Sequence, residues 1–375
     1  FIQNIYPWVL WIAGIHSRQQ CNLCVGLTSM VNAYCNLMSS DGTGTKSIIA
    51  YLYWKETGDL SVWRNIATDV LVMNLDDLLC VGANQTFLYT SVLNRNKHLI
   101  SGDVIAAIID GAQEFMDTMN DYGVDIKYLG GETADLGDSV RTITIDGSMT
   151  TRMLRNNVID TSQVKARNVI VGLSSFGKAK YEKEYNSGIG SNGLTSARHD
   201  VLDKIYLNKY PESYDPNTGT QYLYAGTKKL TDQLDNTPIN IGKALLSPTR
   251  TYAPVLNKIL KECKGNINSI VHCTGGAQTK VLHFVDGVKI IKDNLFDTPP
   301  LFDLIQKESN TSWQEMYKVF NMGSRMEIYL DEKNAQSVID IAQEYGIDAQ
   351  IIGRVENAEK ASVEVHAEHG IFTYQ

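Results

Sequence analysis

Three short stretches of this chain set carboxylates close together, two of them beside glycines, and these residue types could bind a hard metal ion and phosphates. They are 41–46 (DGTGTK), 74–79 (NLDDLL) and 130–135 (GGETAD). Glycine lets backbone N–H groups approach a ligand because it has no Cβ. Carboxylates that converge repel one another unless a cation lies between them, and Mg²⁺ commonly shares its oxygen ligands with substrate phosphates. With Lys46 as a donor to phosphate oxygens, the stretches predict a magnesium–nucleotide site built from three loops.

Each stretch alone also has an ordinary structural interpretation. The run from Gly42 to Lys46 lacks the G-x-x-x-x-G-K-[ST] spacing of a P-loop, so a Walker site is not expected. An Asp pair is common as a helix cap or solvated turn, and Gly-Gly-Glu-Thr is common as a turn. The predicted site therefore depends on all three stretches occurring in this order.

The length and net charge of the chain limit the classes of protein to which it can belong. A chain of 375 residues is too long for one ordinary core, so we predict two domains, 1–160 and 161–375. Its 43% hydrophobic and 20% charged residues are typical of a globular protein. The net charge of −8, with no basic cluster, argues against nucleic acid as a partner. An anionic substrate must then be bound by local cations, helix N-termini or a metal.

Cysteine usage and the apolar segments predict a cytoplasmic protein with no membrane partner. Six cysteines in a long chain fit a reducing compartment. Cys21 and Cys24 form a C-x-x-C, but no second ligand pair follows at zinc spacing. The apolar run at 6–15 is shorter than the roughly 20 residues that a spanning helix needs, and no basic region precedes it.

Hydrophobic periodicity predicts a mixed α/β fold. Glycine-ended or amphipathic patterns indicate helices at 47–56, 63–73, 102–122 and 333–345. Alternating or β-branched runs indicate strands at 124–129, 141–153, 169–173, 267–273, 326–330 and 349–355. The segments 178–185 and 209–220 read as solvated loops, and 320–323 as a buried turn.

Three motifs of the second half carry possible chemistry. Ser191-Asn192-Gly193 lies before a helix that begins near Leu194, where free N–H groups could bind an anion; an N-cap with flexible glycines is equally compatible. Thr249-Arg250 puts a guanidinium beside hydroxyls, which suits a phosphate or carboxylate or else a structural salt bridge. His272 ends a strand before Gly275-Gly276 and is suited either to proton transfer or to packing.

Together and in this order, these stretches resemble the phosphoribosylformylglycinamidine cyclo-ligase (aminoimidazole ribonucleotide synthetase) family. The resemblance covers about 34–355, and the least common of its motifs is 315–323 (EMYKVFNMG). The other matching segments are 41–46, 76–83, 130–135, 191–193, 245–252, 272–276 and 351–355.

The resemblance implies an ATP-dependent ring closure in purine biosynthesis. Formylglycinamidine ribonucleotide is phosphorylated on its amide oxygen by ATP, and the iminophosphate closes to aminoimidazole ribonucleotide. It also implies two α/β domains of mixed sheets, and a homodimer in which N-domain strands of two subunits form a shared barrel. The implied cofactors are ATP and Mg²⁺, and the implied partner is a small phosphorylated substrate.

The resemblance assigns residues to four roles. The catalytic residues would be His272, Lys46 and Arg250. The ATP site would comprise Asp41, Gly42, Thr43, Gly44, Thr45, Lys46, Asp76, Gly131 and Thr133, with Asp135 as a further outer partner. Substrate would contact Ser191, Asn192, Gly193, Thr249 and Arg250. The metal ligands would be Asp41, Asp77 and Glu132.

The chain departs from the family pattern and so indicates a divergent subgroup. Residues 1–33 do not resemble the family's N-terminal region. Gly190 stands where the family usually has a histidine, after an extra charged segment at 178–185, from which Lys180 or Lys183 could replace that histidine. Asn84-Gln85 replaces the usual Glu-Pro. Alternative functions are another ATP-using relative, such as a thiamine-monophosphate kinase, a hydrogenase maturation factor or a selenophosphate synthetase, or a non-catalytic nucleotide-binding homologue.

Overall fold

The computed structural model describes residues 23–26, by their backbone, and residues 33–375. The apolar run at 6–15 and Cys21, about which the sequence made predictions, lie outside these ranges. None of the helices in the described ranges combines the length and the apolar character that crossing a membrane requires.

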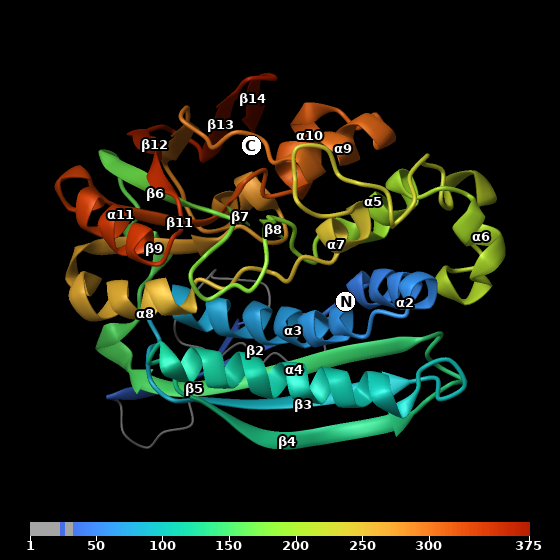
Figure 1. Ribbon diagram of the computed structural model, residues 1–375. Helices are drawn as coiled ribbons and strands as arrows, with labels where there is room; N and C mark the ends of the chain where they lie inside the picture. The colour runs from blue at the N-terminus through green and yellow to red at the C-terminus, as the bar shows by residue number, and fades with distance from the viewer. Residues whose placement is uncertain (1–22, 27–32) are drawn as a thin grey trace, which may run out of the picture.

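The first half of the chain forms a five-stranded mixed sheet in the order β1-β2-β5-β3-β4. Its strands are β1 (Leu23–Gly26), β2 (Tyr34–Gly42), β3 (Phe87–Arg95), β4 (Ile126–Asp135) and β5 (Ile143–Leu154). Only β3 and β4 pair in parallel. Along β5 buried and more exposed residues alternate, as expected for a sheet with one covered face. The helices of this half, α2 (Lys46–Thr57), α3 (Ser61–Cys80) and α4 (Gly102–Asp121), lie on that side (Figure 1).

Helix α3 lies between the two halves of the chain and is buried on nearly all sides. Every residue from Asp69 to Cys80 is buried. The helix contacts β2, β5 and α4 of the first half, and it also contacts strand β9 (Ile267–His272) and helix α8 (Ala253–Glu262) of the second half. A helix without a solvated face is typical of a core position. Acidic residues on such a helix must find partners, because an unpaired buried charge is very costly.

The second half forms a seven-stranded mixed sheet in the order β14-β13-β10-β12-β6-β11-β9, flanked by helices (Figure 1). Its interior strand β6 (Asn168–Ser174) is buried along its whole length. The remaining elements are β7 (Phe176–Gly177), β8 (Asn186–Ser187), α5 (Leu194–Val201), α6 (Ile205–Lys209), α7 (Ile241–Leu245), β10 (Val288–Lys292), α9 (Pro300–Ser309), α10 (Trp313–Val319), β11 (Ser324–Asp331), α11 (Ala335–Glu344), β12 (Ala349–Asn357), β13 (Ser362–Ala367) and β14 (Gly370–Tyr374).

The predicted mixed α/β class is confirmed, and so are most of the predicted elements to within a few residues. Helix α4 and strands β5, β6, β9 and β12 lie where periodicity placed them. The two sheets draw their strands from residues 23–154 and 168–374. The division of the chain at residue 160 stays a prediction.

Two predicted loops are regular structure instead. Residues 74–79 lie inside α3, because both faces of that helix are covered and no amphipathic pattern marks its second half. Residues 130–135 lie in strand β4, at the edge of the first sheet. A Cβ on Gly131 would lie 2.0 Å from the Ser91 carbonyl oxygen, so glycine is needed here for close strand pairing rather than for a turn.

Candidate functional site

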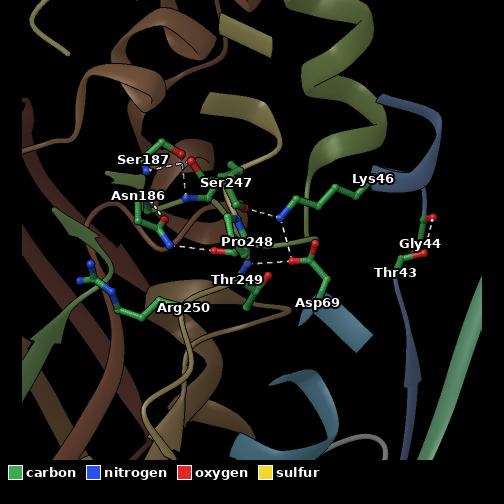
Figure 2. A network of polar contacts seen from close by, with 12 residues as sticks. Thr43, Gly44, Lys46, Asp69, Asn186, Ser187, Ser247, Pro248, Thr249 and Arg250 are labelled. Atoms are coloured by element: carbon green, nitrogen blue, oxygen red, sulfur yellow. Dashed lines mark hydrogen bonds and ion pairs between the residues drawn. The ribbon is translucent and has the colours of Figure 1, made fainter. Parts of the chain in front are cut away.

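A buried ion pair joins the first half of the chain to the segment around Ser247. Lys46, at the start of α2, is fully buried and its Nζ lies 2.7 Å from Asp69 Oδ1 on α3. The same Nζ donates to the Ser247 carbonyl oxygen at 2.5 Å, and the Thr249 N–H donates to Asp69 Oδ1 at 2.8 Å. Figure 2 shows both side chains pointing toward 247–249. Lys46 therefore positions a loop, and its predicted contact with ATP phosphates stays a prediction.

Asp76 makes the second connection from α3 to the same loop. Its carboxylate accepts the Thr251 hydroxyl at 2.7 Å and the Tyr252 N–H at 2.9 Å. Burial raises the pKa of Asp76 to about 7, although both hydrogen bonds and the charge of Arg325 oppose the rise. Asp76 is therefore a structural acid that holds a proton up to near neutral pH.

We expect Asp76 to make the stability of the protein pH-dependent. Because the folded pKa of about 7 exceeds the ordinary value of 3.8, its stabilising contribution is lost as pH rises through 7. The stability of the wild type relative to Asp76→Asn should therefore fall between pH 5 and pH 8, as measured by urea unfolding at several pH values. A difference that stays constant over this range would contradict the prediction. The exposed Asp117→Asn on α4 is the matched control.

Asp77, the next residue of α3, pairs with His272 at the end of β9. Its Oδ1 lies 2.9 Å from His272 Nδ1, and the His272 side chain is fully buried. Burial lowers the pKa of His272 to about 4, against the opposing effect of Asp77, so the ring is neutral at pH 7. A neutral ring beside a carboxylate carries its proton on Nδ1. Its Nε2, which has no partner among the described residues, is then a free proton acceptor.

Arg250 has protein partners for almost all of its donors. It is buried, and it makes a bidentate ion pair with Glu182, with distances of 2.9 Å from Nε and 2.6 Å from Nη2. Its Nη1 donates to the carbonyl oxygens of Ser174 and Phe176. The segment 178–185, predicted as a solvated loop, thus sends Glu182 inward. Four of the five guanidinium donors are thus used, so Arg250 positions this segment, and its predicted contact with substrate stays a prediction.

The three predicted metal ligands do not meet within one chain. Asp41 lies on β2 beside α3, where its carbonyl oxygen accepts Asn74 Nδ2 at 3.4 Å, and Asp77 belongs to the same part of α3. Glu132 lies on the edge strand β4, separated from β2 by β5 and β3, which is roughly 14 Å at the usual strand spacing. In the described ranges no group of three His, Cys, Asp or Glu side chains is arranged to hold a metal ion.

The remaining residues of the predicted ATP site lie in two places. Gly42 ends β2, where its N–H donates to Asp41 Oδ1 at 2.7 Å, and Thr43, Gly44 and Thr45 lead into α2. Thr45 Oγ1 lies 2.8 Å from the hydroxyl of Thr195 on α5, so this loop touches the second half. Gly131 and Thr133 lie on β4 with Glu132, and Thr133 N–H donates to Glu132 Oε1 at 3.0 Å. Asp135 pairs with Lys97 there.

Two of the predicted substrate residues, Asn192 and Thr249, line a small cavity between α3 and the second sheet. Gly190 and Thr274 also belong to its wall. Ser191 and Thr249 each have a buried hydroxyl with no partner in the described ranges. Gly193 has φ +76°, and a Cβ there would lie 2.5 Å from the Phe320 ring. Glycine is thus required for this loop to enter α5.

Sequence reasoning missed three charged residues of this region: Asp69, Glu182 and Arg325. Asp69 lies within an otherwise largely apolar run, 66–73, Arg325 lies at the start of a strand, and both are buried. Charges at such positions are almost never buried without a specific purpose. That pattern was readable in the sequence, although their partners were not.

The fold and site define a two-domain α/β protein whose polar centre lies between its domains. Residues 26–153 match the AIR synthase related protein, N-terminal domain, and residues 165–366 match the AIR synthase related protein, C-terminal domain. The chain belongs to the AIR synthase related family.

Named relatives cover nearly the same span. The chain is 30% identical to the phosphoribosylformylglycinamidine cyclo-ligase of Methanocaldococcus jannaschii, over 86% of this chain and 78% of that protein. It is 28% identical to the protein of the same name from Syntrophus aciditrophicus, over 87% of this chain and 82% of the relative.

Solved structures share the fold at lower identity. A thiamine-monophosphate kinase from Stenotrophomonas maltophilia superposes with a TM-score of 0.54 at 14% identity, covering 94% of this chain and 93% of the kinase. Thermotoga maritima PurL complexed with ATP superposes with a TM-score of 0.51 at 13% identity, covering 92% of this chain and 44% of PurL. The predicted family and fold are thereby confirmed.

Proposed function

We propose that this chain catalyses the ATP-dependent cyclisation of formylglycinamidine ribonucleotide to aminoimidazole ribonucleotide, as an enzyme of purine biosynthesis in the cytoplasm. The observation that carries the proposal is the 30% identity to a cyclo-ligase over 86% of the chain. The buried Asp77–His272 pair between the domains supports it, because it provides the proton acceptor that ring closure needs. The thiols of Cys35, Cys263 and Cys273, which form no disulfide among the described residues, agree with a reducing compartment.

The chain's own residues supply positioning and proton transfer. The amide oxygen of the substrate attacks the γ-phosphorus of ATP, and ADP leaves. The amidine nitrogen then attacks the iminophosphate carbon, the C–O bond to phosphate breaks, and the nitrogen loses a proton. We assign that proton to Nε2 of His272, which Asp77 holds in the required tautomer. Asn192 and Thr249 line the adjacent cavity, and together with Ser191 and Gly193 they would contact the substrate.

Magnesium and ATP fit the first half of the chain in part. Mg²⁺ bound to a nucleotide usually needs only one or two carboxylates, with phosphate and water oxygens as its other ligands. Asp41, partly exposed on β2 beside α3, and Asp77 would be the carboxylate ligands there. The ion would neutralise charge on the transferring phosphoryl group. Glu132 of the same chain lies too far away to join them.

A steady-state assay with ATP, Mg²⁺ and formylglycinamidine ribonucleotide tests the function. The product is followed as a diazotisable aminoimidazole, and ADP is followed in parallel. One aminoimidazole per ADP is the expected result. ADP without aminoimidazole would indicate another phosphoryl acceptor, and neither product would indicate a non-catalytic homologue.

A homodimer through the open face of the first sheet belongs to the same proposal. On the face opposite α3 and α4, the side chains of Tyr34, Met38, Val92 and Leu154 are 38–47% exposed. Strand pairing aligns Tyr34 with Leu154 and so gathers them on one face. Exposed apolar side chains gathered on one sheet face are typical of an interface, and a second copy of the same sheet has the matching apolar face.

We expect Met38→Glu to convert the dimer to a monomer. The new carboxylate would be buried without a partner, which should weaken association by about 10- to 100-fold. Light scattering over a range of protein concentrations measures the change. Ile371→Glu, at an exposed position on β14, is the control and should leave the mass unchanged. A wild type that stays monomeric at micromolar concentration would contradict the proposed dimer.

A further inference from the structure

Arg325 is a fully buried cation whose charge is not neutralised by an ion pair. It is the second residue of strand β11, and only 2% of its surface is exposed to solvent. Among the described residues no carboxylate lies within ion-pair distance of it. Its Nη2 donates to the Arg250 carbonyl oxygen, while its Nε and Nη1 have no partner in the described ranges. Asp76 is close enough to interact with its charge, but the Asp76 oxygens already accept Thr251 and Tyr252.

Three other buried cations of this protein have a counter-ion, whereas Arg198 and Lys280, like Arg325, have none among the described residues. Lys46 pairs with Asp69, Lys292 with Glu327, and Arg250 with Glu182. Removing a guanidinium from water without a counter-ion costs several kcal/mol in general terms. Arg325 lies over the Tyr252 ring and donates from Nη2, but neither contact supplies a negative charge, and a bound anion is the simplest counter-ion for its Nε and Nη1.

Arg325 lines a cavity that two of the predicted substrate residues, Asn192 and Thr249, also line. The other polar or small residues of its wall are Gly190, Cys273, Thr274 and Asn321. A Cβ on Gly190 would lie 3.5 Å from Arg325 Nη1, so the absence of a side chain at 190 leaves that nitrogen open. Thr249 Oγ1 is a second buried donor without a described partner. Two donors from separate segments, Arg325 and Thr249, thus line the same cavity without a partner among the described residues.

The size of the cavity limits what it can accept. Its volume is about 10 Å³, roughly the room that one water molecule needs. A whole phosphate does not fit, but one oxygen of a phosphoryl group does. The cavity also adjoins the strand end that carries His272, since Cys273 and Thr274 belong to its wall.

We propose that Arg325 and Thr249 form an oxyanion subsite that binds one oxygen of the phosphoryl group on the substrate. This inference rests on the proposed function. The oxygen enters when the γ-phosphoryl group leaves ADP for the amide oxygen, and it stays bound until the C–O bond breaks and phosphate departs. Arg325 thereby supplies a fixed positive charge in the second domain, where Gly190 leaves the space that a side chain would fill.

Two variants test the subsite by different means. Arg325→Gln removes the charge and should lower kcat by about 10²- to 10³-fold with a smaller change in KM, as when one oxyanion donor is lost. Gly190→Ala keeps Arg325 and should fold normally, because its Cβ would make only an ordinary contact at 3.5 Å. The methyl group would occupy the cavity and should lower kcat by about tenfold or more.

The matched control is Arg198→Gln. Arg198 is likewise buried, and its Nε and Nη1 also lack described partners, but it does not line the cavity. A general effect of losing a buried arginine would appear in both variants. A loss of kcat specific to Arg325→Gln supports the subsite, and equal losses in the two variants would overturn it.

Binding of inorganic phosphate gives a readout that does not need turnover. Phosphate should raise the thermal midpoint of the wild type above that in chloride of equal ionic strength. The rise should be absent in Arg325→Gln and Gly190→Ala and retained in Arg198→Gln. If the wild type produces no aminoimidazole, the proposed function is contradicted. The response of the thermal midpoint to phosphate still tests the anion site in that case. A phosphate response that survives in both cavity variants would overturn the inference.

Discussion

Asp77→Asn should lower kcat by about 10⁴-fold, the loss expected when a histidine is held in the wrong tautomer. The carboxylate of Asp77 accepts Nδ1–H of His272 at 2.9 Å. An asparagine amide can instead donate to Nδ1, which moves the ring proton to Nε2. His272 could then no longer accept the proton released in ring closure. Steady-state kinetics on the purified variant, with both ADP and aminoimidazole followed, measure the effect.

The fold should survive this substitution. Asparagine has nearly the same size and shape as the aspartate it replaces, so the urea midpoint should shift far less than the activity. Asp117→Asn, on the exposed side of α4, should retain wild-type kinetics. Activity of Asp77→Asn within about threefold of the wild type would contradict both the metal and the tautomer roles of Asp77.

The sequence predicted those elements whose one-sided burial leaves a periodic pattern. Helix α4 has one apolar stripe, and its range was predicted to within a residue. Helix α3 is covered by the first sheet, by α4 and by elements of the second domain at once. The C-terminal part of α3 therefore has no apolar stripe. The acids of that half therefore looked like a loop, although the burial of the helix is what gives them their partners.

The sequence identified which residues belong to the site more readily than it identified the role of each residue. Asp77 and His272 were both selected from sequence, and the structure brings them together across 195 positions of chain. Arg250 was also selected, but only the tertiary structure shows that its guanidinium already forms an ion pair with Glu182. Glu132 fails to join Asp41 because sheet order, which no local pattern encodes, puts two strands between them. Arg325 lies two residues after 320–323, a segment predicted as a buried turn, and only the fold shows that Arg325 has no counter-ion among the described residues.

Lys46→Met should lower the free energy of unfolding by about 3–5 kcal/mol, the usual loss when one member of a buried ion pair is removed. Both side chains of the Lys46–Asp69 pair are fully buried. In the variant Asp69 would keep only the Thr249 N–H as a partner, and the Ser247 carbonyl oxygen would lose its donor. Urea unfolding measures the loss. The control is Lys97→Met, which removes an exposed pair with Asp135 and should leave the midpoint nearly unchanged.

The double variant Lys46→Met/Asp69→Asn separates the value of the pair from the cost of an isolated charge. Asparagine is neutral and its Oδ1 can still accept the Thr249 N–H, so the double variant should be more stable than Lys46→Met alone. Such non-additivity is expected for residues in direct contact. If the loss of stability in the double variant equals the sum of the losses in Lys46→Met and Asp69→Asn, the isolated buried charge is not the source of the instability. If the losses do not add, we infer that the Lys46–Asp69 pair holds 247–249 against α3. Through Thr249, the pair then also positions one wall of the cavity beside Arg325.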